Sequence, residues 1–224
     1  MNSNVSVASR YTTLADDLAH EVEIKRSRFI TYLYRVESEA AARTKIAGLR
    51  KTHFDARHHC SAFVLGADRM VQRSSDDGEP SGTAGIPMLE ALTKRDTGHG
   101  TDLSDIVAIC VRYFGGIKLG AGGLVRAYSD SVSQALDAAT LITRQRMLVL
   151  KVAAAHAHAP RYENELRTAG YQLGATEWTA EHALLEVAVD DVAGAHQDFS
   201  QYLATLSAGI ATAETWGHEW VDIR

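Results

Sequence analysis

The sequence has few cysteines and no long apolar runs, and each of these absences excludes a class of protein. Only two cysteines occur in 224 residues. Cys60 and Cys110 lie far apart in apolar, strand-like runs, which predicts buried reduced thiols of a cytoplasmic protein and excludes a disulfide framework. No apolar run approaches the length of about 18 residues that a transmembrane helix needs. The first ten residues also lack the charged and then apolar pattern of a signal peptide.

The chain also lacks an excess of positive charge. Its net charge of −5 argues against a protein that coats nucleic acid indiscriminately. The charge is unevenly spread, because residues 1–144 carry 18 basic and 17 acidic residues while residues 145–224 carry 5 and 11. The first part is therefore suited to contact phosphate locally, and the second part is better suited to contact protein.

Motifs for nucleotide cofactors and for metals are absent as well. Gly115 and Gly120 match the first half of a P-loop, but Ala121 and Gly122 stand where that motif needs Lys and Ser or Thr. A Rossmann pattern begins at Gly120 and fails, because Val125 occupies the position of its last glycine. No zinc or EF-hand spacing occurs. We therefore expect no cofactor, no metal and no identifiable catalytic residue, and the sequence leans away from an enzyme.

The most unusual stretch, Arg112–Tyr128, is rich in glycine. It follows a β-branched apolar run, Ile106–Val111, which is typical of a buried strand, and it leads into an amphipathic helix that runs to about Ala139. Glycine loses the most chain entropy on folding, so such a cluster indicates backbone with positive φ or close approach by another molecule.

The helix after these glycines lacks a capping side chain between Ile117 and Gly123. Its first N–H groups and the positive end of its dipole therefore face the loop, which suits a phosphate or carboxylate. The alternative is a tight strand-to-helix turn whose glycines serve packing only. The predicted anion or nucleic-acid site comprises Arg112, Tyr113, Gly115, Gly116, Lys118, Gly120, Gly122, Gly123 and Arg126.

A second polar cluster contains His58, Asp76, Asp77 and Glu79. Three carboxylates in four positions repel one another unless something neutralises them. One interpretation is a solvated loop in which Asp76 or Asp77 caps a turn and the others pair with arginines of the glycine-rich stretch. The alternatives are a Mg²⁺ or Ca²⁺ site and a direct role in binding a partner.

The pattern of elements predicts two α+β domains, residues 1–142 and 143–224. Residues 1–18 are expected to form an arm with some helix potential, and residues 66–86 a long loop. The second domain is expected to follow a ferredoxin-like βαββαβ order. The strands and helices predicted for it are 147–153, 160–169, 171–179, 182–189, 191–206 and 210–221.

Four stretches of the first domain closely resemble the YigZ/IMPACT family. They are Ser27-Arg-Phe-Ile, His58-x-Cys60, Ser75-Asp-Asp-Gly-Glu-Pro-x-Gly-Thr-Ala-Gly85 and the whole of Arg112–Tyr128. The resemblance implies an N-terminal α/β sandwich similar to a domain of a small-subunit ribosomal protein. It also implies a C-terminal domain like the last domain of elongation factor G, so that the pair resembles the last two domains of that factor.

The resemblance further implies a role in translation control, and it offers no secure reaction or ligand. The leading hypothesis is a regulator that binds RNA or a ribosomal or translation-factor surface through the glycine-rich loop. A purely protein-binding regulator and a metal-assisted hydrolase using Asp76, Asp77 and Glu79 are the alternatives. No membrane partner is expected.

Overall fold

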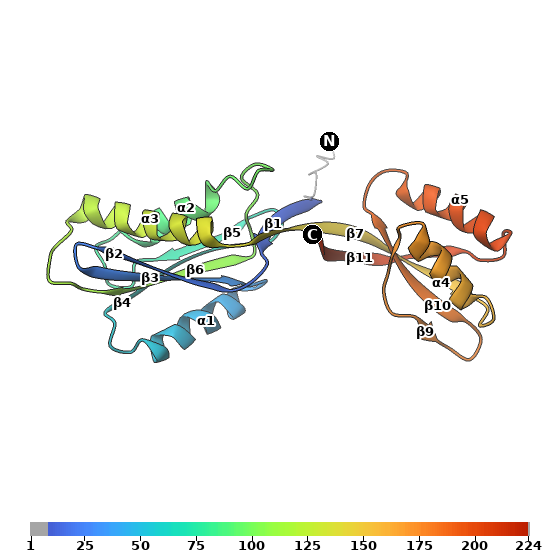
Figure 1. The fold of residues 1–224 in the computed structure, drawn as a ribbon, viewed down its shortest axis with the longest axis horizontal. Helices are drawn as coiled ribbons and strands as arrows, with labels where there is room; N and C mark the ends of the chain where they lie inside the picture. The colour runs from blue at the N-terminus through green and yellow to red at the C-terminus, as the bar shows by residue number, and fades with distance from the viewer. Residues whose placement is uncertain (1–8, 224) are drawn as a thin grey trace, which may run out of the picture. The chain divides into compact units, whose positions relative to one another are not determined.

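A computed structural model describes residues 9–223 of the chain. It shows a mixed α+β protein whose named strand pairs are antiparallel, with five helices in this range. The chain divides into two compact units (Figure 1). The first holds the described residues up to Arg144 together with Ile223, and the second spans Gln145–Asp222.

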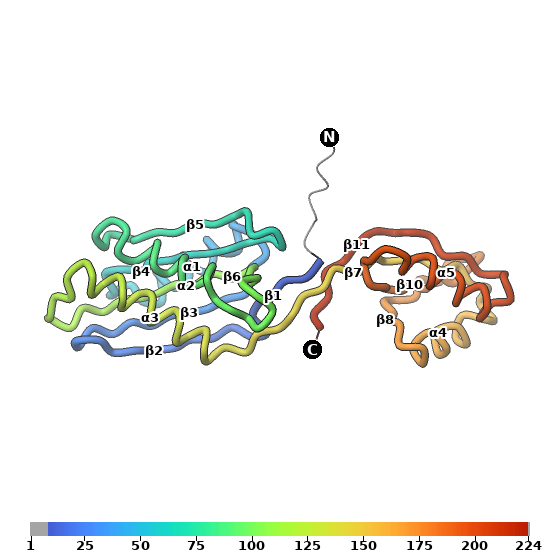
Figure 2. Tube along the Cα trace, turned by 90° about the horizontal axis from the view of Figure 1, so that it is seen from above, coloured from blue at the N-terminus to red at the C-terminus, as the bar shows by residue number. Residues whose placement is uncertain are grey.

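The first unit is built on a five-stranded sheet in the order β2-β3-β6-β4-β5. Its central strand carries almost only apolar residues and is buried along nearly its whole length, as expected for a strand covered on both faces. Figure 2 shows β5 and β2 along the two opposite edges of this unit. Their bounds are β2 Leu18–Ile24, β3 Ser27–Arg35, β6 Ile106–Tyr113, β4 His58–Leu65 and β5 Val71–Ser75.

Three helices cover the two faces of this sheet, α2 and α3 on one face and α1 on the other (Figure 1). Helix α1, Glu39–Thr52, begins where the Ser38 hydroxyl accepts a hydrogen bond from the Ala41 amide, which is a standard helix cap. Helix α2 spans Gly85–Thr93, and α3 spans Ala121–Ala138.

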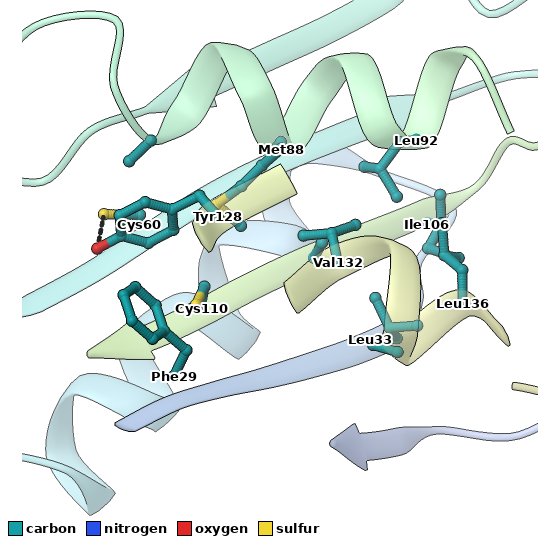
Figure 3. Close-up of a cluster of buried hydrophobic side chains, with 14 of the residues drawn as sticks. Phe29, Leu33, Cys60, Met88, Leu92, Ile106, Cys110, Tyr128, Val132 and Leu136 are labelled. Carbon is teal, nitrogen blue, oxygen red and sulfur yellow. Dashed lines mark hydrogen bonds between the residues drawn. The ribbon is translucent and has the colours of Figure 1, made fainter. Parts of the chain in front are cut away.

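The core between α2, α3 and the sheet follows from the apolar spacing of α3. Its buried side chains recur every three or four residues, so that one side of the helix packs on the sheet. Tyr128 is the largest of them and meets Phe29 of β3 edge to face at 5.2 Å between ring centroids. Figure 3 shows Tyr128, Val132 and Leu136 packed among residues of β3, β6 and α2.

The second unit contains two helices and a sheet built around β7 and β10. Strand β10 pairs antiparallel with β7 on one side and with the two-residue strands β8 and β9 on the other, and β11 also pairs with β7. The elements that lie in it wholly or for most of their length are β7 Leu141–Ala154, α4 Ala159–Thr168, β8 Gln172–Leu173, β9 Glu177–Trp178, β10 Ala183–Asp190, α5 Ala195–Ser207 and β11 Ala213–Ile223.

The structure corrects several expectations from the sequence. The predicted arm contains strand β1, Arg10–Leu14, whose last four residues are buried, while residues 1–8 lie outside the described range. The predicted loop 66–86 contains β5, and the predicted strand 171–179 is broken into two short strands. The division into compact units falls after Arg144, within β7 and two residues beyond the boundary given from the sequence, so this expectation is not among those corrected. None of the helices in residues 9–223 has the length and apolar character to span a bilayer.

Candidate functional site: a cleft between the glycine-rich and acidic loops

The two polar clusters found in the sequence meet in one cleft of the first unit. The cleft has a volume of about 360 Å³, and it lies between the N-terminus of α3 and the loop that carries Glu79. We call this feature the cleft throughout. Its lining residues are Arg57, His58, Glu79, Pro80, Arg112, Phe114, Lys118, Leu119, Gly120, Ala121 and Leu124.

Arg112 is the buried cation of the cleft. It lies near the end of β6 directly opposite His58 of β4, which places both residues on the cleft side of the sheet. Its side chain is only 7% exposed, and its Nη1 donates a hydrogen bond of 2.5 Å to Oε1 of Glu79. The guanidinium carbon also lies 5.3 Å from the ring centroid of Phe29 and 5.7 Å from that of Phe114. A buried arginine needs such a partner, because an isolated buried charge is very costly.

Glu79 receives a second hydrogen bond from inside the core. The hydroxyl of Tyr128 donates to the same Oε1 atom at 2.8 Å, and the Cys60 thiol lies 3.3 Å from that hydroxyl. Burial raises the pKa of Tyr128 far above its ordinary value, so this hydroxyl stays protonated and remains a donor. The carboxylate is therefore fixed in place by Arg112 and Tyr128 together.

His58 presents one ring nitrogen to the cleft. Its Nδ1 lies 3.0 Å from the carbonyl oxygen of Asp77. Because a carbonyl only accepts, Nδ1 carries the proton in this contact, and Nε2 of the neutral ring is left as an acceptor. That Nε2 lies 3.9 Å from Oε2 of Glu79, beyond hydrogen-bond distance.

Asp76 and Asp77 hold the acidic loop together. The carboxylate of Asp76 accepts hydrogen bonds from the amides of Gly82, Gly85 and Ala84 at 2.8, 2.8 and 3.0 Å, next to the start of α2. Burial alone would raise the pKa of Asp76, but these three amides together hold it below its ordinary value.

Asp77 has two separate partners, Arg50 of α1 and the amide of His59, at 2.5 and 2.6 Å. The three carboxylates of the loop thus each have their own partners, which is the capping and pairing arrangement considered from the sequence. Asp77 differs from that expectation, because its arginine lies in α1 and not in the glycine-rich stretch. Within residues 9–223, no group of three or more His, Cys, Asp or Glu side chains is arranged to hold a metal ion.

The start of α3 forms the opposite wall of the cleft. Gly120 precedes the helix with φ of 75°, and in the described part of the chain no side chain caps it. The first amide bonded within the helix is that of Leu124, which donates to the Gly120 carbonyl at 2.9 Å. The amides of residues 121–123 therefore remain available beside Lys118, as an anion site requires.

The positions of this loop are occupied by glycine for different physical reasons. At Gly115 a Cβ atom would lie 1.9 Å from the carbonyl oxygen of Arg26, so the chain has no room for a side chain there. Gly116 and Gly120 have φ of 86° and 75°, which glycine adopts at little cost. A Cβ at Gly123 would lie 3.0 Å from Cβ of Leu119.

Neither a close contact nor a positive φ explains the glycine at position 122, because a Cβ there would meet no atom within 4 Å and the φ of Gly122 is not positive. Neither packing nor backbone conformation in the described structure requires a glycine at this place.

Of the nine residues predicted for the anion site, Arg112, Lys118 and Gly120 line the cleft, and six do not: Tyr113, Gly115, Gly116, Gly122, Gly123 and Arg126. Tyr113 follows Arg112 in β6 and therefore points to the other face of the sheet. Its hydroxyl donates to Asp55 at 3.0 Å and contacts His53, beside the end of α1. Arg126 is exposed on α3 and does not belong to the cleft lining.

Reasoning from the sequence missed several lining residues. Arg57 directly precedes His58 in the sequence, and this adjacency could have identified Arg57 as a lining residue. Phe114 is an apolar residue at the end of a buried strand and beside glycines, a place where an exposed ring is unusual. Tyr128 does not line the cleft, but its hydroxyl holds Glu79, and the general need of a buried tyrosine hydroxyl for a partner was the available signal.

Comparison with known proteins agrees with the motifs. The family described as the Impact N-terminal domain matches residues 25–136. IMPACT family member YvyE of Bacillus subtilis is 41% identical over 199 residues, which cover 89% of this chain and 88% of that protein. IMPACT family member YigZ of Escherichia coli is 51% identical over 116 residues, covering 51% and 54% of the two chains.

A solved structure is also similar. It is titled as the crystal structure of a hypothetical protein, and it matches with a TM-score of 0.61 and 37% sequence identity. The match covers 92% of this chain and 96% of that one. Since both the domain match and the full-length relative point the same way, the chain belongs to the IMPACT family.

Proposed function

We propose that this protein is a translation-associated regulator that binds RNA phosphate, on the ribosome or in free RNA, through the cleft. Membership of the IMPACT family suggests a translation-related regulator. The observation that carries the molecular part of the proposal is the uncapped start of α3, which faces the cleft beside Lys118. Backbone amides at a helix start and nearby cations are the groups that bind phosphate.

The charge balance of the cleft supports this ligand class. Arg57, Arg112 and Lys118 contribute three positive charges, and Glu79 is the one carboxylate in the lining. Because Glu79 is occupied by Arg112 and Tyr128, the field at the start of α3 stays positive. A local positive site on a chain with a net charge of −5 suits a selective phosphate contact better than general coating of nucleic acid.

We further infer that the two units are the ribosomal-protein-like and ferredoxin-like domains that the motifs imply. For the second unit, the support is the strand order β11-β7-β10-β8, with β8 and β9 on the same side of β10. This is the order that a split βαβ arrangement produces when two helices connect its strands. A pair of such domains is compatible with binding to an RNA-rich surface.

The test is the salt dependence of RNA binding by the full-length chain. Fluorescence anisotropy with a labelled single-stranded RNA between 50 and 200 mM salt should show affinity that falls steeply with salt. Lys118→Ala should weaken binding and reduce the slope of log affinity against log salt by about 1.

Lys94→Ala is the matched control, because Lys94 lies at the far end of α2 in an exposed pair with Glu90. It should leave both the affinity and the slope unchanged. RNA binding that is absent, or that responds equally to both substitutions, would remove the proposed function.

A protein-binding role is the second candidate, and it is favoured by the second unit. Residues 145–224 carry 5 basic and 11 acidic residues, and Trp216 is 72% exposed on β11. Exposed tryptophan is enriched at protein interfaces. Capture of a basic translation component by wild-type protein but not by Trp216→Ala would support this role.

A further inference from the structure

We propose that the cleft holds one unstacked nucleotide, with its base at the buried end and its phosphate at the start of α3. This proposal rests on the proposed function and specifies its ligand. Two sources offer the same chemistry, a free mononucleotide and an unpaired nucleotide of an RNA strand.

The buried end of the cleft offers a donor and acceptors that the protein does not use. Of the three guanidinium nitrogens of Arg112, only Nη1 has an acceptor within the described structure. The side chain is nevertheless more than nine-tenths buried and lines the cleft. Leaving such a group without a partner costs free energy, so a ligand that supplies an acceptor is favoured.

The acceptors are Glu79 and His58. Both hydrogen bonds to Glu79 end on Oε1, while Oε2 accepts no hydrogen bond in the described structure and lies 3.9 Å from Nε2 of His58. In the tautomer in which Nδ1 of His58 donates to the Asp77 carbonyl, Nε2 is itself an acceptor. Adjacent donor and acceptor atoms are what a protein uses to read the hydrogen-bonding edge of an unpaired base.

An exposed aromatic ring stands next to these groups. Phe114 lines the cleft, is 47% exposed, and has the guanidinium of Arg112 5.7 Å from its ring centroid. Exposed rings of this kind bind unstacked bases by stacking, and arginine planes contribute in the same way. Leu119, Leu124 and Pro80 provide further apolar surface.

The anion site lines the same cleft. The available amides of residues 121–123 and the ammonium group of Lys118 suit a phosphate, and a ligand with a single polar end would leave one of the two sets of polar groups unused. The volume of about 360 Å³ belongs to the range of small-molecule sites and is too small for a duplex.

The experiment measures binding of free ligands to the full-length chain by calorimetry. The probes are the four nucleoside 5′-monophosphates, ribose 5-phosphate and inorganic phosphate, each titrated at the same ionic strength. At least one mononucleotide should bind about tenfold or more tightly than ribose 5-phosphate, because stacking on an aromatic ring contributes that much per base.

Two variants separate the two ends of the ligand. Phe114→Ala should lose this tenfold advantage and leave phosphate binding unchanged, whereas Phe114→Tyr should keep it. Phe54→Ala is the matched control, because Phe54 is 84% exposed and lies outside the cleft. Lys118→Ala should weaken the binding of every phosphate-containing probe.

The outcomes distinguish this proposal from the proposed function. Mononucleotides that bind no better than ribose 5-phosphate, or equally to wild type and Phe114→Ala, would overturn the nucleotide site even if RNA binding depended on Lys118. Mononucleotide binding without RNA binding would uphold the site, assign it to free nucleotides and overturn the proposed function. Competition of a mononucleotide with single-stranded RNA but not with duplex RNA would uphold both.

Discussion

Arg112 and Glu79 form a buried ion pair in which the two side chains are only 7% and 4% exposed and Nη1 lies 2.5 Å from Oε1. The pair connects the end of the central strand β6 to the acidic loop, and Tyr128 of α3 adds a third contact. The same residues that line the cleft therefore also hold its two walls together. Stability and ligand binding are coupled at this place.

Replacing Glu79 by alanine should destabilise the first unit by about 3–5 kcal/mol, because it leaves Arg112 buried without its counter-charge. Urea unfolding followed by circular dichroism measures the change. Glu90→Ala is the control, since Glu90 pairs with Lys94 on the surface and such pairs contribute about 0–1 kcal/mol. Equal effects of the two substitutions would show that the buried pair contributes no more to the free energy of unfolding than the surface pair does.

Asp76 should make the stability of the first unit depend on pH. Its folded pKa lies below the ordinary value of 3.8, so its contribution is complete above that pH and is lost as the pH falls through the folded pKa. Asp76→Asn should lose about 1–2 kcal/mol at neutral pH, comparable to loss of a helix cap, and less in strong acid.

The measurement is thermal unfolding of wild type and variant between pH 2 and pH 7. The difference between the two proteins should shrink as the pH falls below about 4, where the wild-type carboxylate takes up its proton. Asp137→Asn is a suitable control, because Asp137 is exposed and forms a surface pair with Arg95. A difference that stays constant across this range would contradict the assigned role of Asp76.

Much of the first unit follows from its sequence. The apolar run of β6 and the spacing of α3 predict a buried strand and a helix packed on it, and both are confirmed. Strand β5 was missed because all its residues are exposed, so Val71–Ser75 shows no apolar alternation. Strand β1 was missed because Thr12 and Thr13 are polar residues that happen to be buried, so the sequence shows no apolar run there.

The candidate site was predictable in its composition but not in its geometry. The cluster of glycines and the missing cap identify the start of α3, since both depend on local sequence alone. The sequence suggested that carboxylates of the acidic loop pair with arginines of the glycine-rich stretch, but not that Glu79 and Arg112, 33 residues apart, form the pair. Tyr113 is different, because strand alternation alone places it on the face opposite Arg112.

The two cysteines should be unreactive in the folded protein. They face each other on neighbouring strands as free, buried thiols, and burial raises the pKa of Cys110 to about 12 and that of Cys60 further. Thiolate is the reacting species, so alkylation by iodoacetamide at pH 8 should be very slow. In urea both cysteines should be modified, which mass spectrometry detects. Fast labelling of the folded chain would contradict this burial.

A substitution at Gly122 should change stability and ligand binding in opposite directions. Alanine in the first turn of a helix is more favourable than glycine by up to about 1 kcal/mol, and a Cβ here meets no atom of the folded chain. Gly122→Ala should therefore raise the melting temperature. If the proposed phosphate site is at the start of α3, the added methyl group should at the same time weaken RNA and mononucleotide binding, because it would crowd a phosphate against the amides there.

Two other glycines serve as controls for this result. Gly48 lies inside α1, where a Cβ would also meet no atom within 4 Å, so Gly48→Ala should raise stability and leave binding unchanged. Gly115→Ala should disrupt the first unit, because its Cβ would collide with the Arg26 carbonyl. If Gly122→Ala binds RNA as well as Gly48→Ala does, the amides of α3 do not contact the ligand, and the phosphate must bind elsewhere.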